Sequence, residues 1–549
     1  MVTSGPAGSV DGMKRWWPLV ALAAAQFVMV LDQSVMNVSI SQLVADFHTT
    51  VTVIQAVITL YCLVMAMLML TGGKVGDIIG RRRAFVVGLV IYGCGSALTA
   101  VAPTVAVLAI GWSVLEGIGA ALVLPALAAL IAGNYDDARE RKVAYAVIGG
   151  VAGAGIAVGP ILGGWATTEL TWRVVFLGEV VLVLFIILMV RLVQDAPRSG
   201  PSPRLDLIGG VLSAVGLGAV VLGILQSSTW GLVQPKNPPF APFGFSLTIY
   251  VIMLGGILLW AFGRWERRRE AAGTDPLVHL SLLRIPPLRS GLAGMFTQNL
   301  VLMGVFFVVP LYLQLVQGLN ALETGLKMLP VSITMFLASF LGSRLSTRYP
   351  VRSIVRAGLI ITTLAVVALF ATVKPELGNA AFGIAMAVLG VGMGLIVSQL
   401  GNVVQSSVDS SGRGEAGGLQ YTGQQLGSSL GVALIGAIVL AGLAGAFVSK
   451  IQSDARINQA VAGQVSVAVG AGLSFVATDE VRAAATKAGL DAPTTEAIVD
   501  DYQQAQLQAL RGGFLATAIF SLISLASTRH LPHTRPSAQP EKETVAAPA

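Results

Sequence analysis

The chain has 549 residues, of which 54% are hydrophobic and only 11% are charged, and its mean hydropathy is +0.77. Soluble globular domains carry roughly 25% charged residues, so this composition excludes an ordinary soluble enzyme and also a disordered chain. The formal net charge of +7 would suggest a nucleic-acid partner in a soluble protein, but in a membrane protein the basic residues first mark cytoplasmic loops. We therefore expect an integral membrane protein that is no enzyme and binds no nucleic acid.

Apolar segments of ~17–25 residues, the length of a membrane-spanning helix, recur along the chain. The fourteen segments lie at 17–40, 53–73, 84–103, 105–133, 143–165, 174–193, 206–228, 245–263, 290–316, 325–343, 354–373, 380–408, 416–446 and 512–528. They lack the alternation of barrel strands and exceed the ~9–11 residues that such a strand needs. The first segment runs well past the small residues that would suit signal-peptide cleavage, so we interpret it as an uncleaved helix. The expected fold class is an all-α polytopic membrane protein with fourteen transmembrane helices.

The basic residues predict the orientation of these helices. With the N-terminus inside, cytoplasmic segments hold 26 of the 35 lysines and arginines, as the positive-inside rule requires. Five of the other nine lie in one long segment, 447–511, and long translocated segments follow the rule poorly. We therefore expect a multi-pass protein of the cell membrane with a cytoplasmic N-terminus (1–16), an extracytoplasmic segment (447–511) and a disordered cytoplasmic tail (529–549).

An internal repeat is visible at an offset of about 270 residues. Gly155 and Gly159, shifted by 272 positions, fall on Gly427 and Gly431. Repeats that meet around a site at the membrane midplane are the layout of transporters. The expected organisation is a six-helix bundle, two inserted helices and a second six-helix bundle: 17–193, 206–263 and 290–528.

A charged motif joins the second and third spans. Residues 73–83 read G-K-V-G-D-I-I-G-R-R-R, which has the spacing G-x-x-x-D-x-x-G-R-R. This motif resembles the signature loop of the major facilitator superfamily. The resemblance implies a charge latch whose breaking accompanies alternating access. The gating residues that it implies are Gly73, Asp77, Gly80, Arg81 and Arg82.

The fifth span contains a glycine-rich string. Gly155, Gly159 and Gly163 are four residues apart and would form one smooth stripe against a neighbouring helix, while Pro160 removes a backbone hydrogen bond and permits a bend. Tight helix packing alone would explain the glycines. Together with Gly164, however, the string is similar to the G-x-x-x-G-P-x-x-G-G motif of facilitator-superfamily exporters that run as antiporters, and this resemblance implies export.

The first span places a carboxylate, Asp32, deep in an apolar run. An intramembrane acid is costly and marks a functional site by default. Residues 31–38 read L-D-Q-S-V-M-N-V and resemble the L-D-x-T-x-x-N-V element of fourteen-helix drug:proton antiporters (the EmrB/QacA-type family). Outside the tail and 447–511, this resemblance covers nearly the whole chain.

Two further acids depart from that family's pattern. Glu116 stands in the fourth span where relatives have glutamine, and the arginine that usually precedes it is replaced by Ser113. Glu179 adds an acid in the sixth span, although it could simply pair with a polar neighbour near the outer surface. At 1.5 Å per residue, these acids and Asp32 share the central-to-outer level of the first bundle. We expect roles in proton coupling or substrate binding for all three, and the unpaired Glu116 favours cationic substrates.

Polar residues in the spans supply candidates for a substrate cavity, although helix-to-helix hydrogen bonding is their alternative use. The candidates are Asn37, Gln298, Asn299 and Gln314. The four histidines form no pair at ligand spacing and no nucleotide-binding motif is present, so we expect no metal, no cofactor and no use of ATP.

The expected function is export of amphiphilic, drug-like small molecules in exchange for protons, by a monomer that works through alternating access. Two alternatives stay open. One is a dedicated exporter of a single endogenous metabolite, lipid or siderophore. The other is a membrane receptor or sensor that kept the fold without transport.

Overall fold

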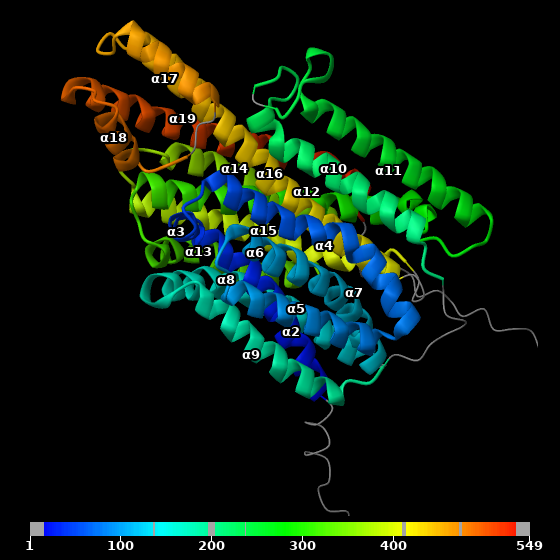
Figure 1. Cartoon of the computed structure of the whole chain (residues 1–549). Helices are drawn as coiled ribbons and strands as arrows, with labels where there is room; N and C mark the ends of the chain where they lie inside the picture. Colours follow the sequence, from blue (N-terminus) through cyan, green and yellow to red (C-terminus); the bar gives the residue numbers. More distant parts are fainter. Residues whose placement is uncertain are drawn as a thin grey trace, which may run out of the picture.

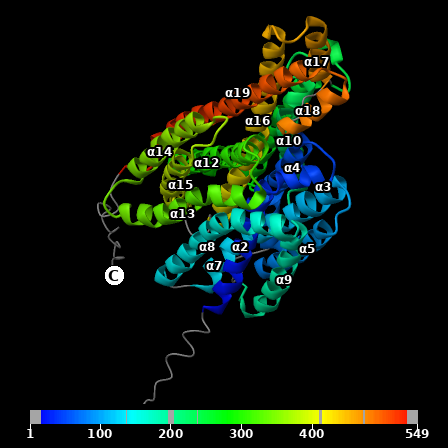
Figure 2. The ribbon, with the colours of Figure 1, turned by 90° about the vertical axis from the view of Figure 1, so that its left-hand side faces the viewer.

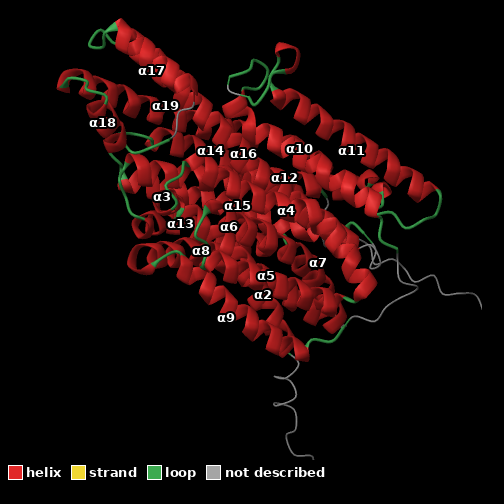
Figure 3. Ribbon diagram, in the orientation of Figure 1, coloured by secondary structure: helices red, strands yellow, loops and turns green. Residues whose placement is uncertain are grey.

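The computed structural model describes residues 16–135, 138–195, 204–236, 238–408, 413–471 and 475–533. Within these ranges every regular element is a helix and no strand occurs (Figure 3). Fourteen helices there are long and apolar enough to cross a membrane. The predicted all-α polytopic fold class is therefore confirmed.

The first group of helices precedes residue 196. It comprises α2 (Trp17–Val38), α3 (Ile40–Asp46), α4 (Val51–Ile79), α5 (Arg81–Ala100), α6 (Val105–Leu108), the π-helix η1 (Ala109–Glu116), α7 (Gly117–Asn134), α8 (Ala138–Trp165), the π-helix η2 (Ala166–Leu170), α9 (Arg173–Met189) and η3 (Val190–Leu192). Helix α2 packs on α8, and α5 packs on both α7 and α9. The fourth predicted span is thus three helical pieces in sequence, α6, η1 and α7.

Two long helices then form a hairpin on the side of the molecule (Figure 1). They are α10 (Leu207–Trp230) and α11 (Leu247–Ala271), with the short helices η4 (Pro242–Gly244) between them and η5 (Leu280–Arg284) after them. Helix α10 packs on α4 and on α16 (Arg413–Ser453), whereas α11 packs mainly on α10. The hairpin therefore lies outside the other helices.

The second group of helices begins at residue 286. It comprises α12 (Pro286–Leu311), the π-helix η6 (Tyr312–Val316), α13 (Ala321–Leu345), α14 (Val351–Thr372), α15 (Asn379–Ser406), α16, α17 (Gln459–Ala471), α18 (Thr478–Lys487), α19 (Ala492–Ser524) and η7 (Leu525–His530). Within it, α13 packs on α15 and α12 on α16. The two groups meet where α4 contacts α16 and where α8 contacts α13.

The segment 447–511 is continuous with its flanking helices. Helix α16 runs on to Ser453 and α19 begins at Ala492, so the predicted limits at 446 and 512 cut through helices. Helices α17 and α18 complete the segment, which projects from one end of the molecule (Figures 1 and 2). Of the termini predicted at 1–16 and 529–549, residues 1–15 and 534–549 lie outside the described residues, while η7 continues to His530.

The charged motif at 73–83 is almost entirely helical rather than a loop. Helix α4 continues to Ile79 and α5 begins at Arg81, which corrects the loop expected from the sequence. Only Gly80 interrupts the helices, with a φ of 102° that non-glycine residues rarely adopt. We refer to this end of the molecule as the Asp77 end, and to the opposite end, where α2 stops at Val38, as the Gln314 end.

Candidate functional site

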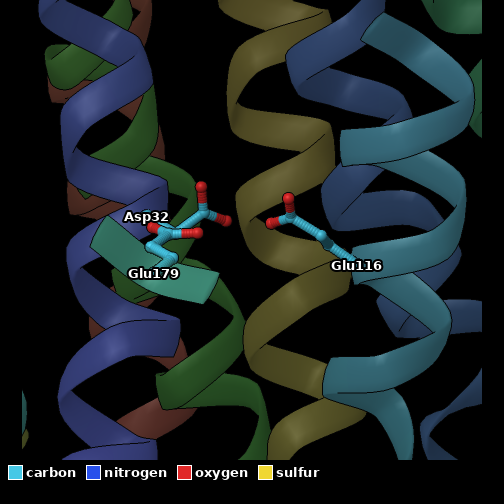
Figure 4. Close-up of side chains that lie close together, drawn as sticks. All are labelled: Asp32, Glu116 and Glu179. Atoms are coloured by element: carbon cyan, nitrogen blue, oxygen red, sulfur yellow. The ribbon is translucent and has the colours of Figure 1, made fainter. Parts of the chain in front are cut away.

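Three acids from separate helices converge inside the first group. Asp32 comes from α2, Glu116 is the last residue of η1, and Glu179 comes from α9. In each side chain a carboxylate oxygen lies within 4.8 Å of the other two, and no side chain is more than 1% exposed. Figure 4 shows Glu116 reaching toward the other two from the opposite side. We call these residues the acid cluster.

A tryptophan holds the Asp32 carboxylate in place. Trp112, within η1, donates its indole N–H toward both oxygens of Asp32, at 2.8 and 3.0 Å. Tyr61 of α4 stacks on the Trp112 ring with centroids 4.9 Å apart and an interplanar angle of 14°. Hydrogen bonds to an ionised group are the stronger kind, so this contact orients the carboxylate firmly.

Two residues of α5 form hydrogen bonds with the carboxylates of Glu116 and Glu179. Ser96 Oγ lies 2.9 Å from Glu116 Oε1 and 3.1 Å from Glu179 Oε2, but its single proton can be donated to only one of them at a time. Tyr92 donates its hydroxyl to Glu179 Oε2 at 3.1 Å. Glu116 and Glu179 are thus connected through α5 as well as by proximity.

The backbone of η1 brings Glu116 to this position. Segments with π-helical bonds are rare and occur frequently at functional sites, and η1 holds both Trp112 and Glu116. It approaches α5 very closely, since a Cβ added to Gly95 would lie 2.6 Å from the Gly111 oxygen and 2.7 Å from Glu116 Cγ. Only a glycine at position 95 leaves room for the Glu116 side chain there.

The acid cluster lacks a positively charged partner in the described part of the chain: no lysine or arginine there forms an ion pair with any of the three acids. Two ionised carboxylates at this separation would repel each other by about 3 kcal/mol at an effective dielectric constant of about 20. The cluster can therefore take up positive charge, as protons, a cation or a charged group of a ligand.

The glycine string of α8 packs against α2, the helix that carries Asp32. A Cβ added to Gly155 would lie 3.1 Å from Val30 Cβ, and one added to Gly163 would lie 2.8 Å from Val35 Cγ1. One added to Gly159 would overlap the side chain of Ser34. The stripe is therefore a close helix contact, and every turn of it touches α2.

The end of the same string contacts the second group of helices. A Cβ added to Gly164 would lie 2.8 Å from the Cα atom of Leu322 in α13. One added to Gly325 would overlap the Pro160 carbonyl. Leu322 also donates its backbone N–H to Thr168 Oγ1 at 3.1 Å. The α8–α13 crossing thus depends on small residues from both groups.

At the Asp77 end, Asp77 and Arg81 form an ion pair across the Gly80 break. The backbone N–H of Arg82 donates to Asp195 Oδ1 at 3.2 Å. Gly73 lies on the face of α4 toward α7, because an added Cβ would be 3.6 Å from Pro125 Cβ. The motif residues therefore join α4, α5 and the segment after α9.

Of the four polar candidates, Gln314 is hydrogen-bonded across the two groups. Its Nε2 donates to the Val38 carbonyl at 2.7 Å, and its Oε1 accepts from the Ser41 N–H at 3.3 Å. It also lines a cavity of about 260 Å³ at this end. Asn37 and Asn299 donate to carbonyls four residues earlier in their own helices.

The sequence analysis missed several groups around these sites. Trp112, Ser96 and the two tyrosines contact the acids or one another, and Gln33 donates to Gln425 of α16 at 3.0 Å. Gln298, the remaining polar candidate, is buried in α12. The position of Trp112, four residues before Glu116, was one signal available in the sequence.

A profile described as the Major Facilitator Superfamily matches residues 22–432. The chain belongs to the major facilitator superfamily. It is 31% identical over 430 residues to the puromycin resistance protein of Streptomyces alboniger, covering 77% of this chain and 82% of that protein. It is 30% identical over 477 residues to a probable actinorhodin transporter of Streptomyces coelicolor, covering 84% of this chain and 79% of that protein.

The chain also shares its fold with a solved structure. A bacterial homologue of the human lysosomal transporter Spinster superposes with a TM-score of 0.60 at 14% sequence identity, over 94% of this chain and 98% of that one. The protein is thus a multi-pass membrane transporter of small molecules and no enzyme, and its relatives include antibiotic exporters and resistance proteins.

Proposed function

We propose that this transporter exports amphiphilic, drug-like molecules across the cell membrane in exchange for protons, and that the acid cluster couples the two fluxes. The observation that carries the proposal is the convergence of three buried carboxylates within 4.8 Å without an ion-paired lysine or arginine in the described part of the chain. Such a cluster favours bound protons, since ionised acids so close together repel. An intramembrane acid that can gain and lose a proton is a recurrent element of proton relays.

The proposed cycle is alternating access between the two groups of helices, 17–193 and 290–528, with 206–263 as an inserted pair. Contacts such as Gln314 with Val38 would separate when the Gln314 end opens. The Asp77–Arg81 pair would act as the latch at the other end. We propose that both termini are cytoplasmic, so that the Gln314 end faces outward, and that one chain is the working unit.

A dedicated exporter of one endogenous metabolite is the second candidate. It is favoured by the likeness to a probable actinorhodin transporter, which is 30% identical. The buried charge of Glu116 would in either case favour a cationic or protonated substrate.

The test is proton release from inside-out vesicles that contain the full chain. After acidification of the lumen, adding a substrate such as puromycin should discharge the pH gradient, and an uncoupler should stop substrate accumulation. A panel of amphiphilic cations would separate a broad from a dedicated exporter. Binding without any accumulation would overturn the proposal in favour of a receptor.

A further inference from the structure

Three buried oxygen atoms at the acid cluster lack hydrogen-bond partners. They are Glu116 Oε2, Glu179 Oε1 and the Tyr61 hydroxyl. All three residues are at most 1% exposed. Tyr61 stacks on Trp112, the residue bonded to Asp32, and its hydroxyl lies beside the Asp32 carboxylate. Since an unsatisfied buried polar group is costly, these oxygens would be stabilised by a ligand that contacts them.

The hydrogen bonds already present supply too few donors for the oxygens of the carboxylates. The donors are the Trp112 indole and the hydroxyls of Ser96 and Tyr92, and ionised carboxylates accept several bonds each. A ligand that offered only acceptor oxygens would add acceptors without donors, so the carboxylate oxygens would stay unsatisfied. A positively charged ligand would correct both the charge and the unsatisfied oxygens at once.

We propose that the acid cluster and Tyr61 bind a dehydrated hard cation of the size of Na⁺ or Ca²⁺. The inference deepens the proposed coupling role of the same acids and rests on it. Carboxylate and hydroxyl oxygens are the ligands that such cations prefer. The transporter would then respond to an ion other than the proton.

Burial and hydration discriminate between cations. Ca²⁺ takes about six to eight oxygen ligands at about 2.3–2.6 Å in flexible geometry, whereas Mg²⁺ demands near-octahedral ligands at about 2.0–2.1 Å and sheds its water reluctantly. The three carboxylate oxygens lie within 4.8 Å of one another, and all three acids are at most 1% exposed. Such burial favours a cation that binds without its water.

Calorimetric titration of the purified full-length chain tests this proposal. NaCl, CaCl₂ or MgCl₂ is added at one fixed pH, with choline chloride keeping the ionic strength constant. We expect saturable heat and a rise in thermal unfolding temperature with NaCl or CaCl₂ and neither with MgCl₂. The arm that saturates identifies the ion.

Matched variants locate the binding. Glu179→Gln should weaken binding at least tenfold, and Tyr61→Phe, which removes one oxygen, severalfold. Glu266→Gln changes a buried acid elsewhere, in α11, and should leave binding unchanged. If Glu179→Gln fails to fold, Tyr61→Phe still tests whether the cation binds at the acid cluster.

The outcomes separate this inference from the proposed function. Absence of saturable binding in every arm, or binding that neither Glu179→Gln nor Tyr61→Phe weakens, overturns the cation site even if proton-driven efflux persists. Binding that follows the variants supports the site even if vesicles show no efflux, a result that would instead overturn proton-coupled export.

Discussion

The Trp112 indole N–H points at the Asp32 carboxylate and lies within 3.0 Å of both its oxygens. The two residues are 80 positions apart in the chain, and a π-helical segment carries the tryptophan. The contact couples the helix of Asp32 to the helix of Glu116, so it connects two of the three acids.

Replacing Trp112 with phenylalanine tests this connection. Trp112→Phe keeps an aromatic ring against Tyr61 but removes the donor to Asp32. A hydrogen bond to a charged group contributes ~1.5–3 kcal/mol, so proton-coupled efflux should fall by about tenfold or more. The measurement is substrate-induced discharge of the pH gradient in vesicles. Trp165→Phe, at a residue 46% exposed, serves as control, and an equal loss in both variants would contradict the prediction.

Asp32→Asn should abolish uphill efflux while the protein still folds. The amide has almost the same shape as the carboxylate but cannot exchange a proton, so coupling is lost and packing is kept. Efflux against a gradient is measured beside expression level and unfolding temperature. Glu169→Gln, at an exposed acid in η2, should behave as wild type. Full proton-driven transport by Asp32→Asn would rule out its coupling role.

Glu116→Gln should lose cationic substrates selectively. The glutamine fills the same space and restores the residue usual in the resembled antiporters, but it removes one negative charge from the acid cluster. Because Asp32 and Glu179 remain to exchange protons, we expect at least a tenfold loss of efflux for permanent cations and less than a twofold change for neutral compounds. If Glu116→Gln leaves the efflux of both permanent cations and neutral compounds unchanged, Glu116 acts only as a hydrogen-bonding residue.

A single methyl group should suffice to disturb the α8–α2 contact. Gly159→Ala would drive a Cβ into Ser34, and overpacking costs about 1–3 kcal/mol. We expect a lower unfolding temperature and weakened efflux. Gly149→Ala, in the same helix, meets nothing within 4 Å and should be tolerated. If the two variants are equally stable, α8 does not depend on that contact.

The amide of Gln314 should keep its end of the molecule closed. Gln314→Ala removes both bonds to α2 and α3. The reporter is Ser41→Cys in a Cys94→Ser background, because Cys94 is exposed. After Gln314→Ala, the thiol at position 41 should react several-fold faster with a membrane-impermeant maleimide added outside. Gln317→Ala provides the control, because the Gln317 amide donates only to second-group residues. Unchanged labelling after Gln314→Ala would exclude a latch there.

Much of the fold followed from local sequence alone. Hydrophobic runs long enough to cross a bilayer must form helices, because lipid offers the backbone no hydrogen-bond partners, and this fixed the number of spans. Polar breaks located most helix ends, but not those of α16 and α19, because these helices continue beyond their apolar stretches into polar sequence. The helical character of residues 73–79 was missed for the same reason, since glycines in the motif resemble a loop.

The sequence by itself determined the class of protein, the order of its spans and the presence of acids in apolar surroundings, because these depend on residue type and spacing. The tertiary structure alone decided that Asp32, Glu116 and Glu179 meet, since they lie on three helices whose contacts depend on packing. It also decided their partners: Trp112 reaches Asp32 from η1, and Gly95 admits Glu116 beside α5. Which helix a buried side chain or a glycine contacts is a cooperative property of the folded chain, which no local pattern encodes.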